Sequence, residues 1–304
     1  MILIPNAIRQ AKTAQLPTFN PPNLPIPQYP GDAPKRINTT LIVAETIVTV
    51  ILSSVVDNIV AGNLGTTLLI GGLSAIAAQT WRQFTTFSRR KQKYHREIAD
   101  YRQDKQKRER QKRSHYQQKQ AAFQRDSVLE ALSKTIPHDG DRSEAYPGDS
   151  EAKFYSYLKK YFGNNIHTKL TLDIRNFQHP YSPDFTYIDH RINLYVDVEI
   201  DEPYSYKDKK RKPIHYIGLD AKRDRFFLEK GWIIIRFSEE QIVCYPESCC
   251  KVIAETISSL VSDNSIISRF DNVFPLPKRK RWTKNEAEEM ARIDYRKTYL
   301  SRSR

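Results

Sequence analysis

The sequence predicts a mixed α/β domain preceded by an apolar helical hairpin and a long basic helix. Three observations lead to this fold class. Short apolar runs alternate with amphipathic segments across residues 150–262, two apolar blocks occupy residues 41–61 and 64–79, and residues 82–134 carry 16 basic against 6 acidic residues. The chain has 304 residues, 39% hydrophobic and 28% charged, which is enough for one or two domains with a core of ordinary size.

The first 37 residues hold 8 of the 17 prolines. Each proline fixes φ and removes a backbone donor, so residues 1–37 are predicted to form an extended, disordered arm. The opening run Met1-Ile2-Leu3-Ile4 is too short for the apolar core of a signal peptide and has no basic start.

Residues 38–81 are predicted to form a transmembrane helical hairpin. A spanning helix needs about 20 apolar residues, which the first block supplies and the second reaches only if Thr80 and Trp81 extend it. A turn is expected near Gly62 and Asn63. No Lys or Arg lies between Arg36 and Arg82, the pattern of a hairpin with both ends in the cytoplasm. A membrane is therefore the first predicted partner.

A polar stripe runs through the first block, and it leaves an alternative open. Its residues recur every fourth position, so they share one helical face: Glu45, Thr49, Ser53 and Asp57. The stripe is expected to face the second helix, whose glycines at 65, 71 and 72 permit close packing. The alternative is an amphipathic hairpin that is soluble in the cytoplasm or lies on the membrane surface.

Residues 82–146 are predicted to form a basic helical stalk. No Gly or Pro interrupts the chain from Leu73 to Ile136, and the heptad of apolar residues fades after Tyr101. The excess of basic over acidic residues in this stalk suits a polyanion, either nucleic acid or an anionic membrane surface.

Residues 147–263 are predicted to form the α/β domain in the order αβββαβα. The expected elements are a helix from Ser150 to Tyr161, strands at 169–174, 184–188 and 193–200, a helix at 219–230, a buried strand at 232–237 and a closing helix at 246–262. The three cysteines, Cys244, Cys249 and Cys250, exclude a disulfide scaffold and are expected to be buried thiols.

Carboxylates gather on the third predicted strand. If Val196 and Val198 face the core, then Asp197, Glu199 and Asp201 share the opposite face. The neighbouring strand begins with Pro183-Asp184, which would add a fourth carboxylate. Such convergence favours a hard divalent cation, which prefers oxygen ligands.

These residues also carry a resemblance to a known family. Pro183-Asp184, followed by Asp197-Val198-Glu199-Ile200-Asp201, is similar to the motif of the PD-(D/E)xK nuclease superfamily. The downstream residues resemble its very-short-patch-repair-like endonuclease branch: His215, then Asp220, Arg223 and Asp224, then the strand 231–237. The resemblance covers about residues 150–260 and implies a restriction-endonuclease-like αβββαβ core that hydrolyses phosphodiester bonds.

The resemblance also implies roles for particular residues. Asp184 and Glu199, with the carbonyl of Ile200, would bind Mg²⁺ or Mn²⁺, and the metal would lower the pKa of a water and stabilise charge on the phosphate. Glu151 is expected to hold a water in the outer shell, or simply to stabilise the first turn of its helix. Arg236 is expected to pair with Asp220 or Asp224.

One position departs from the superfamily, because Asp201 stands where the lysine is expected. His215 is one candidate to replace it, since a His near its ordinary pKa is suited to proton transfer. The other candidates lie in the following loop: Lys207, Lys209, Lys210 and Lys212. The candidate catalytic set is Asp184, Glu199, Asp201, His215 and Glu151.

Residues 264–304 are predicted to be a basic tail, whose run Lys278, Arg279, Lys280 and Arg281 would bind nucleic-acid phosphates. The sequence as a whole predicts a membrane-anchored, metal-dependent endonuclease that acts on DNA, with RNA as the other substrate class. The rival prediction is a non-catalytic nucleic-acid-binding or membrane-scaffolding protein on a diverged nuclease fold.

Overall fold

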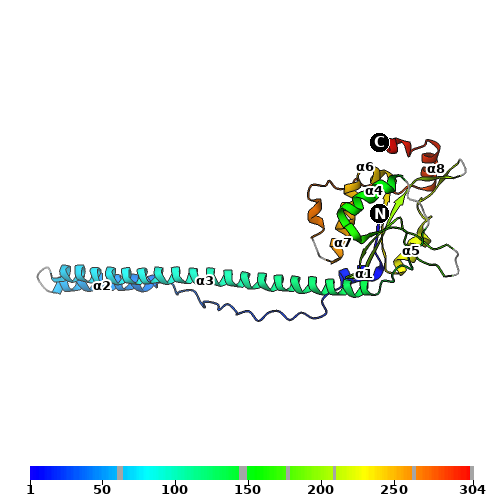
Figure 1. The fold of residues 1–304 in the computed structure, drawn as a ribbon. Coiled ribbons are helices and arrows are strands. Elements are labelled where there is room, and N and C mark those ends of the chain that lie inside the picture. Colours follow the sequence, from blue (N-terminus) through cyan, green and yellow to red (C-terminus); the bar gives the residue numbers. More distant parts are fainter. Residues whose placement is uncertain (60–63, 144–148, 176–178, 208–209, 262–264, 302–304) are drawn as a thin grey trace. The chain divides into compact units, whose positions relative to one another are not determined.

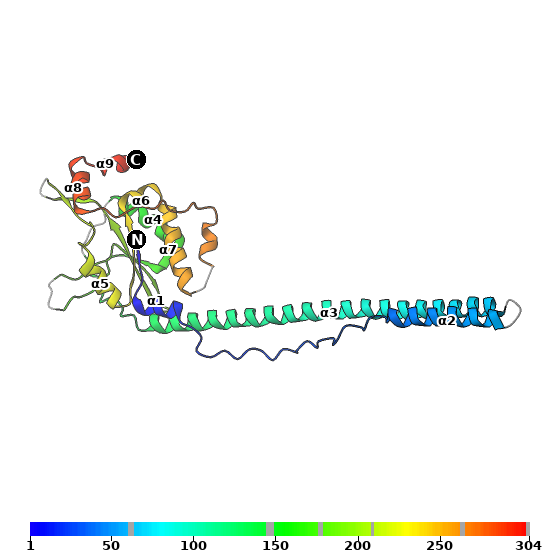
Figure 2. The same cartoon turned by 180° about the vertical axis from the view of Figure 1, so that it is seen from behind.

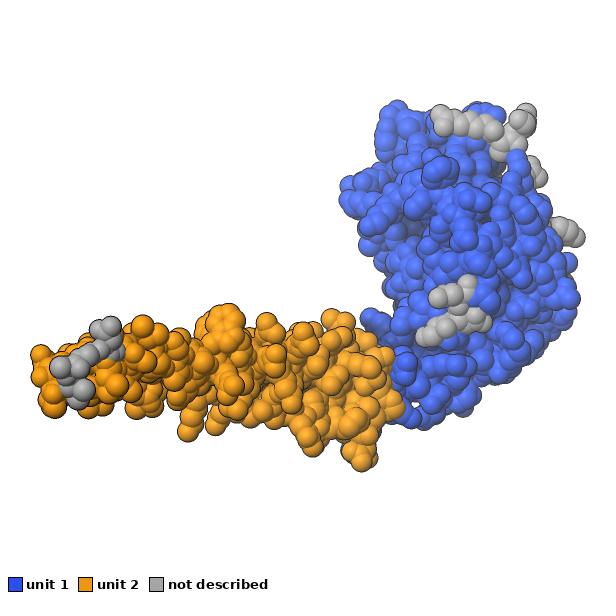
Figure 3. Space-filling view, turned by 90° about the vertical axis from the view of Figure 1, so that its left-hand side faces the viewer, with its two compact units in different colours: residues 1–18, 118–304 blue, residues 19–117 orange. Residues whose placement is uncertain are grey.

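The computed structural model describes residues 1–59, 64–143, 149–175, 179–207, 210–261 and 265–301. The chain divides into two compact units (Figure 3). The globular unit comprises residues 1–18 and 118–304, and the hairpin unit comprises residues 19–117. The division falls inside the long helix α3 (Leu64–Ser133). The turn predicted near Gly62 and Asn63 lies outside the described residues.

A mixed sheet with the strand order β1-β7-β4-β3-β2 forms the centre of the globular unit (Figure 1). Its strands are β1 (Ile2–Leu3), β2 (Ile166–His167), β3 (Phe185–Asp189), β4 (Leu194–Asp201) and β7 (Ile233–Ser238). β4 pairs antiparallel with β3 and parallel with β7, so it is the central strand. The predicted mixed α/β class is therefore confirmed.

Helices cover both faces of this sheet, and Figure 2 shows α5 on the opposite side from α7. On one face, Val196 and Val198 of β4 belong to the same core cluster as Phe154 of α4 (Asp149–Phe162) and Ile253 of α7 (Pro246–Val261). The other face carries a smaller apolar cluster that includes Phe227 of α5 (Ala221–Glu229). Polar side chains of β4 on this second face are therefore withdrawn from water.

The prediction of a disordered arm over residues 1–37 is wrong for its first part. Ile2 and Leu3 form β1, which pairs antiparallel with Ile235 and Ile234 of β7. The following helix α1 (Asn6–Thr13) buries Ile8 in the core. Proline does not prevent this, because Pro5 immediately precedes the helix, where its missing N–H costs no helical hydrogen bond. Residues 14–38 form no helix or strand.

The strand predicted at residues 169–174 is also wrong. Only isolated bridges occur there, at Thr171 and Leu172, and the edge strand of the sheet is β2 instead. Lys169 adopts a left-handed backbone conformation with φ of 63°, which an extended strand does not allow.

Two features follow β4 and β7 that the sequence did not predict. β5 (Tyr204–Lys207) and β6 (Lys210–Pro213) form a separate two-stranded ribbon, and α6 (Glu239–Cys244) follows β7 directly. The predicted basic tail is folded rather than extended. It forms α8 (Lys284–Arg292) and α9 (Lys297–Leu300), and it buries Ala287 and Tyr299.

In the hairpin unit, the polar stripe of α2 (Thr39–Ile59) faces Gly65 and Gly72 of α3, as predicted, whereas a Cβ at Gly71 would meet nothing within 4 Å. A Cβ at Gly72 would lie 2.5 Å from Cγ2 of Thr49, and a Cβ at Gly65 would collide with Asp57 and the Ser53 carbonyl. Close packing at these positions requires glycine. The apolar side chains of α2 point away from this seam and are exposed, Ile47 and Ile51 among them.

Among the described residues one helix, α2, is long and apolar enough to cross a membrane, with a mean hydropathy of 2.0. The second apolar block does not form a separate helix. It continues without interruption into the basic stalk, and the two together make the 70 residues of α3.

Candidate active site

The three carboxylates of β4 share one buried face, as predicted. Asp197, Glu199 and Asp201 are 0%, 4% and 5% exposed, because α5 and the segments beside it cover this face of the sheet. Burial of ionised carboxylates is costly unless cations or hydrogen bonds compensate it. The partners of these side chains therefore decide what the site can do.

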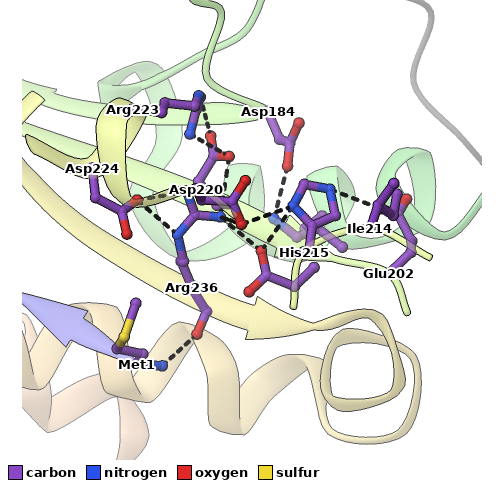
Figure 4. A network of polar contacts seen from close by, with 12 residues as sticks. Met1, Asp184, Glu202, Ile214, His215, Asp220, Arg223, Asp224 and Arg236 are labelled. Atoms are coloured by element: carbon purple, nitrogen blue, oxygen red, sulfur yellow. Dashed lines mark hydrogen bonds and ion pairs between the residues drawn. The ribbon is translucent and has the colours of Figure 1, made fainter. Parts of the chain in front are cut away.

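Arg236 of β7 supplies the first compensating charge. Its Nη1 donates to Asp201 at 2.7 Å, and its Nη2 and Nε donate to Oδ1 of Asp224 on α5 at 2.7 and 3.1 Å (Figure 4). Asp220 lies further away, with its Oδ2 3.8 Å from Nη1. The pairing predicted for Arg236 is thus confirmed with Asp224.

Arg223 of α5 supplies the second charge, and its partner was not predicted. Its guanidinium contacts both carboxylate oxygens of Glu199, Nη1–Oε2 at 2.5 Å and Nη2–Oε1 at 2.6 Å. Nη2 also donates to the Ser182 carbonyl at 3.0 Å. Burial alone would raise the pKa of Glu199, but Arg223 and Arg236 outweigh it and hold that pKa below its ordinary value.

Asp184 lies beside Glu199, just before β3. Its Oδ2 accepts a hydrogen bond from the backbone N–H of Ile200 at 2.7 Å. Burial and the charge of Glu199 raise the pKa of Asp184 well above its ordinary value. The two candidate metal ligands are therefore brought together, close enough for the charge of Glu199 to affect the pKa of Asp184.

Glu151 of α4 lies close to Asp184. It lines, with Asp184 and Lys169, a cavity of about 280 Å³. The charge of Glu151 adds to the rise in the pKa of Asp184, so the two carboxylates interact electrostatically. Among the candidate residues, this cavity unites Glu151 and Asp184.

His215 belongs to a neighbouring cluster. Its Nδ1 lies 3.3 Å from Asp220 and 3.6 Å from Asp201, and its Nε2 lies 3.7 Å from Glu202 (Figure 4). Burial would lower the pKa of His215, but these three carboxylates together raise it. His215 therefore lies among carboxylates at the end of β4, and its role as the base stays a prediction.

Asp201, His215 and Asp220 place one ligand atom each within 4.8 Å of one another, which is close enough for a metal ion. Asp201 is already bound by Arg236, and Asp220 lies 3.5 Å from Arg281. Arg236 and Arg281 thus place positive charge beside the carboxylates of this second cluster.

The four predicted phosphate-binding residues have different surroundings. Arg279 forms an ion pair with Glu240, and Arg281 lies 3.5 Å from both Asp220 and the His215 carbonyl. Lys278 and Lys280 are exposed. Two of the four side chains thus contact the protein, which leaves the two lysines directed to solvent.

Asp184, Glu199 and Ile200 fit a hard divalent cation. All their donors are oxygen atoms, the ligands that hard divalent cations prefer, and burial together with the charge of Glu199 raises the pKa of Asp184, so a cation here would favour its ionised form. In a β-strand the N–H and C=O of one residue leave the same edge, so the Ile200 carbonyl is directed to the edge where its N–H meets Asp184. Glu199 can bind the cation only if its carboxylate oxygens contact both Arg223 and the cation.

No protein-family model, curated protein or solved structure matches this chain.

Proposed function

We propose that this protein is a membrane-anchored, metal-dependent nuclease that hydrolyses phosphodiester bonds in DNA. The observation that carries the proposal is the meeting of Asp184 and Glu199 on one buried sheet face, with the Ile200 amide bonded to Asp184. Two acidic side chains, one on β4 and one just before β3, form the kind of oxygen site that Mg²⁺ or Mn²⁺ prefers.

In this proposal Asp184, Glu199 and the Ile200 carbonyl hold the cation. When bound, the cation lowers the pKa of a water and stabilises charge on the phosphate. Glu151 opens onto the same cavity as Asp184 and orients that water. Arg223 and Arg236 keep Glu199 ionised, and Arg236 also fixes Asp201. His215 lies beside Asp201 and Asp220 and is the candidate for proton transfer in place of the missing lysine.

The membrane part of the proposal rests on α2 and on the charges around it. The apolar residues of α2 are exposed, and its polar side chains pack against α3. No Lys or Arg lies between Arg36 and Arg82. Together these features are typical of a hairpin inserted from the cytoplasm. Both ends of the chain are then cytoplasmic, where the basic part of α3 meets anionic lipid or nucleic acid.

The test is cleavage of plasmid DNA by the full chain with and without Mg²⁺. The full chain is needed because β1 and α1 belong to the globular unit. Glu199→Gln and Asp184→Asn are expected to abolish cleavage while circular dichroism stays unchanged. Asp173→Asn, on an exposed aspartate that pairs with Arg142, is the matched control and should cleave normally. Equal cleavage by wild type and Glu199→Gln contradicts the site assignment.

One observation favours the second candidate, a non-catalytic nucleic-acid-binding protein. Both oxygens of Glu199 are held by Arg223, so the buried acidic row has cationic partners without a metal. This candidate predicts that Mn²⁺ binds no more tightly to the wild type than to Asp184→Asn, and that DNA is bound but not cut.

A further inference from the structure

Lys169 lines the same cavity of about 280 Å³ as Glu151 and Asp184. When ionised, these two carboxylates make the wall of the cavity acidic. Like charges repel, so a phosphate group enters only if positive charge offsets them. Within the described residues that line the cavity, Lys169 has the one positively charged side chain. The cation that the protein itself supplies to this cavity is therefore Lys169.

The ammonium group of Lys169 is not engaged by the fold. Lys169 is exposed, and its ammonium group makes no ion pair or hydrogen bond with the described part of the chain. Arg223 differs in this respect, because its guanidinium contacts both carboxylate oxygens of Glu199 and donates to the Ser182 carbonyl. Of these two cations beside the candidate site, Lys169 is the one available to a bound anion.

The backbone holds Lys169 in an uncommon conformation. Its φ is 63°, and its carbonyl accepts a hydrogen bond from the N–H of Ser143 at 3.1 Å. Three other non-glycine residues of the described chain have a positive φ, and all are of types enriched in this region: Asn193, His215 and Asp294. Lysine is not such a type, and glycine would adopt this φ without steric cost. Backbone strain of this kind at a cavity indicates a functional use of the side chain.

We propose that Lys169 binds the substrate phosphate that enters this cavity and neutralises part of its charge. The inference rests on the proposed nuclease function and adds a catalytic residue to it. A cation held in place beside a phosphate stabilises the charge that develops there during hydrolysis. Lys169 follows β2 directly, so its charge comes from a segment far from Asp201, the position at which the superfamily has its lysine. Proton transfer is not required of Lys169 in this role.

The first measurement is DNA binding without divalent metal. Full-length chain in detergent is titrated into a fluorescent DNA duplex, and anisotropy is followed over a series of salt concentrations. Lys169→Gly removes the ammonium group and suits the left-handed backbone. It is expected to flatten the log–log salt slope by about 0.9, the contribution of one duplex phosphate contact. Lys169→Arg keeps the charge and the slope. Lys134→Ala is the matched control, because Lys134 is exposed, pairs with Glu130 and does not line the cavity.

The second measurement is cleavage of plasmid DNA with Mg²⁺ at saturating DNA. Lys169→Gly is expected to lower kcat by at least about 100-fold, as removal of one group that stabilises charge in a transition state does. Its Mn²⁺ affinity in calorimetry should equal that of the wild type, because Lys169 holds no metal. Its midpoint of urea denaturation should be no lower than that of the wild type, since glycine relieves the backbone strain.

The two measurements together decide the inference. A flatter slope and a lower kcat in Lys169→Gly, with both kept in Lys169→Arg and Lys134→Ala, support it. A wild-type slope or a wild-type kcat in Lys169→Gly overturns it. A loss of Mn²⁺ affinity or of stability in Lys169→Gly also overturns it, because Lys169 would then maintain the cavity rather than bind phosphate. If the wild type cuts no plasmid but its salt slope depends on Lys169, the nuclease proposal fails while the phosphate contact stands.

Discussion

Arg223 holds Glu199 through both oxygens of its carboxylate, with its guanidinium over the ring of Phe227, 4.8 Å from its centroid. This ion pair and a cation on Glu199 compete for the same two oxygens. Hydrogen bonds between charged groups, such as the one from Nη2 to Oε1, are about twice as strong as neutral ones, so the competition is expected to affect metal affinity directly.

Replacing Arg223 with Gln is expected to tighten Mn²⁺ binding by about tenfold, a gain of about 1.4 kcal/mol, because Glu199 loses its competing cation. Isothermal titration calorimetry on the full chain measures this change. Arg223→Lys keeps the charge and should bind Mn²⁺ with wild-type affinity. Unchanged or weaker binding by Arg223→Gln would contradict the competition, and a loss of binding in Asp184→Asn confirms which site is being titrated.

The carboxyl group of Asp197 is expected to lower the free energy of unfolding as the pH rises. It is 0% exposed, neither carboxylate oxygen has a hydrogen-bond partner within the described residues, and burial and Glu199 raise its pKa well above 3.8. A carboxyl with a raised pKa in the folded state binds its proton more tightly there, so stability is lost as the pH rises from about 4 toward that raised pKa.

Asp197→Asn removes this loss without changing the shape of the side chain. Its free energy of unfolding, relative to wild type, is therefore expected to increase by about 1.4 kcal/mol for each pH unit in that range. Urea denaturation between pH 4 and pH 8 gives the difference. A flat line for Asp197→Asn would rule the assignment out.

Gly231 ends the turn before β7 in a left-handed conformation with φ of 89°. A Cβ there would lie 2.8 Å from Oγ1 of Thr135 and 3.0 Å from its Cα. Gly231→Ala is expected to lower the free energy of unfolding by more than about 2 kcal/mol, because backbone strain and collision add. Gly163 has φ of 57° with open space around it, so Gly163→Ala should lose only about 1 kcal/mol. Equal losses would show that the Thr135 contact is unimportant.

The exposed face of α2 is expected to hold the protein in the membrane. Val43, Ile47 and Ile51 lie four residues apart and are 53–56% exposed. Changing all three to Asp should release the full chain from membranes washed with carbonate, since charges at membrane depth are costly. Changing the same three to Ala keeps the helix apolar and should leave it bound. Release of the wild type by high salt alone would indicate surface attachment instead.

Local patterns were enough to predict the centre of the site. Alternation of Val and carboxylate residues correctly placed Asp197, Glu199 and Asp201 on one face of β4, which is the central strand. The three cysteines are free, and Cys249 and Cys250 are buried as predicted, whereas Cys244 is only half-buried.

Contacts between distant segments could not be predicted this way. β1 has two residues and pairs with a strand more than 230 positions away, so no periodicity reveals it. The sequence of β6 is Lys-Arg-Lys-Pro, and lysine and proline are depleted in strands. This strand forms because Arg211 donates hydrogen bonds to the Ala291 carbonyl of α8 and to Asp294. The bond between Arg223 and Glu199 depends on how α5 packs over β4, which side-chain spacing alone does not fix.

The pairing of β1 with β7 sets an order of events during synthesis. Ile2 is synthesised 233 residues before its partner Ile235, on the order of 10 to 50 seconds earlier at 5–20 residues per second. The helices α2 and α3 are also synthesised during that interval. Ile2 and Leu3 must therefore wait for β7, and this edge of the sheet closes only when the two strands meet. Until then the edge of β7 offers unpaired backbone groups to any other strand, so truncated chains that lack β1 are expected to aggregate.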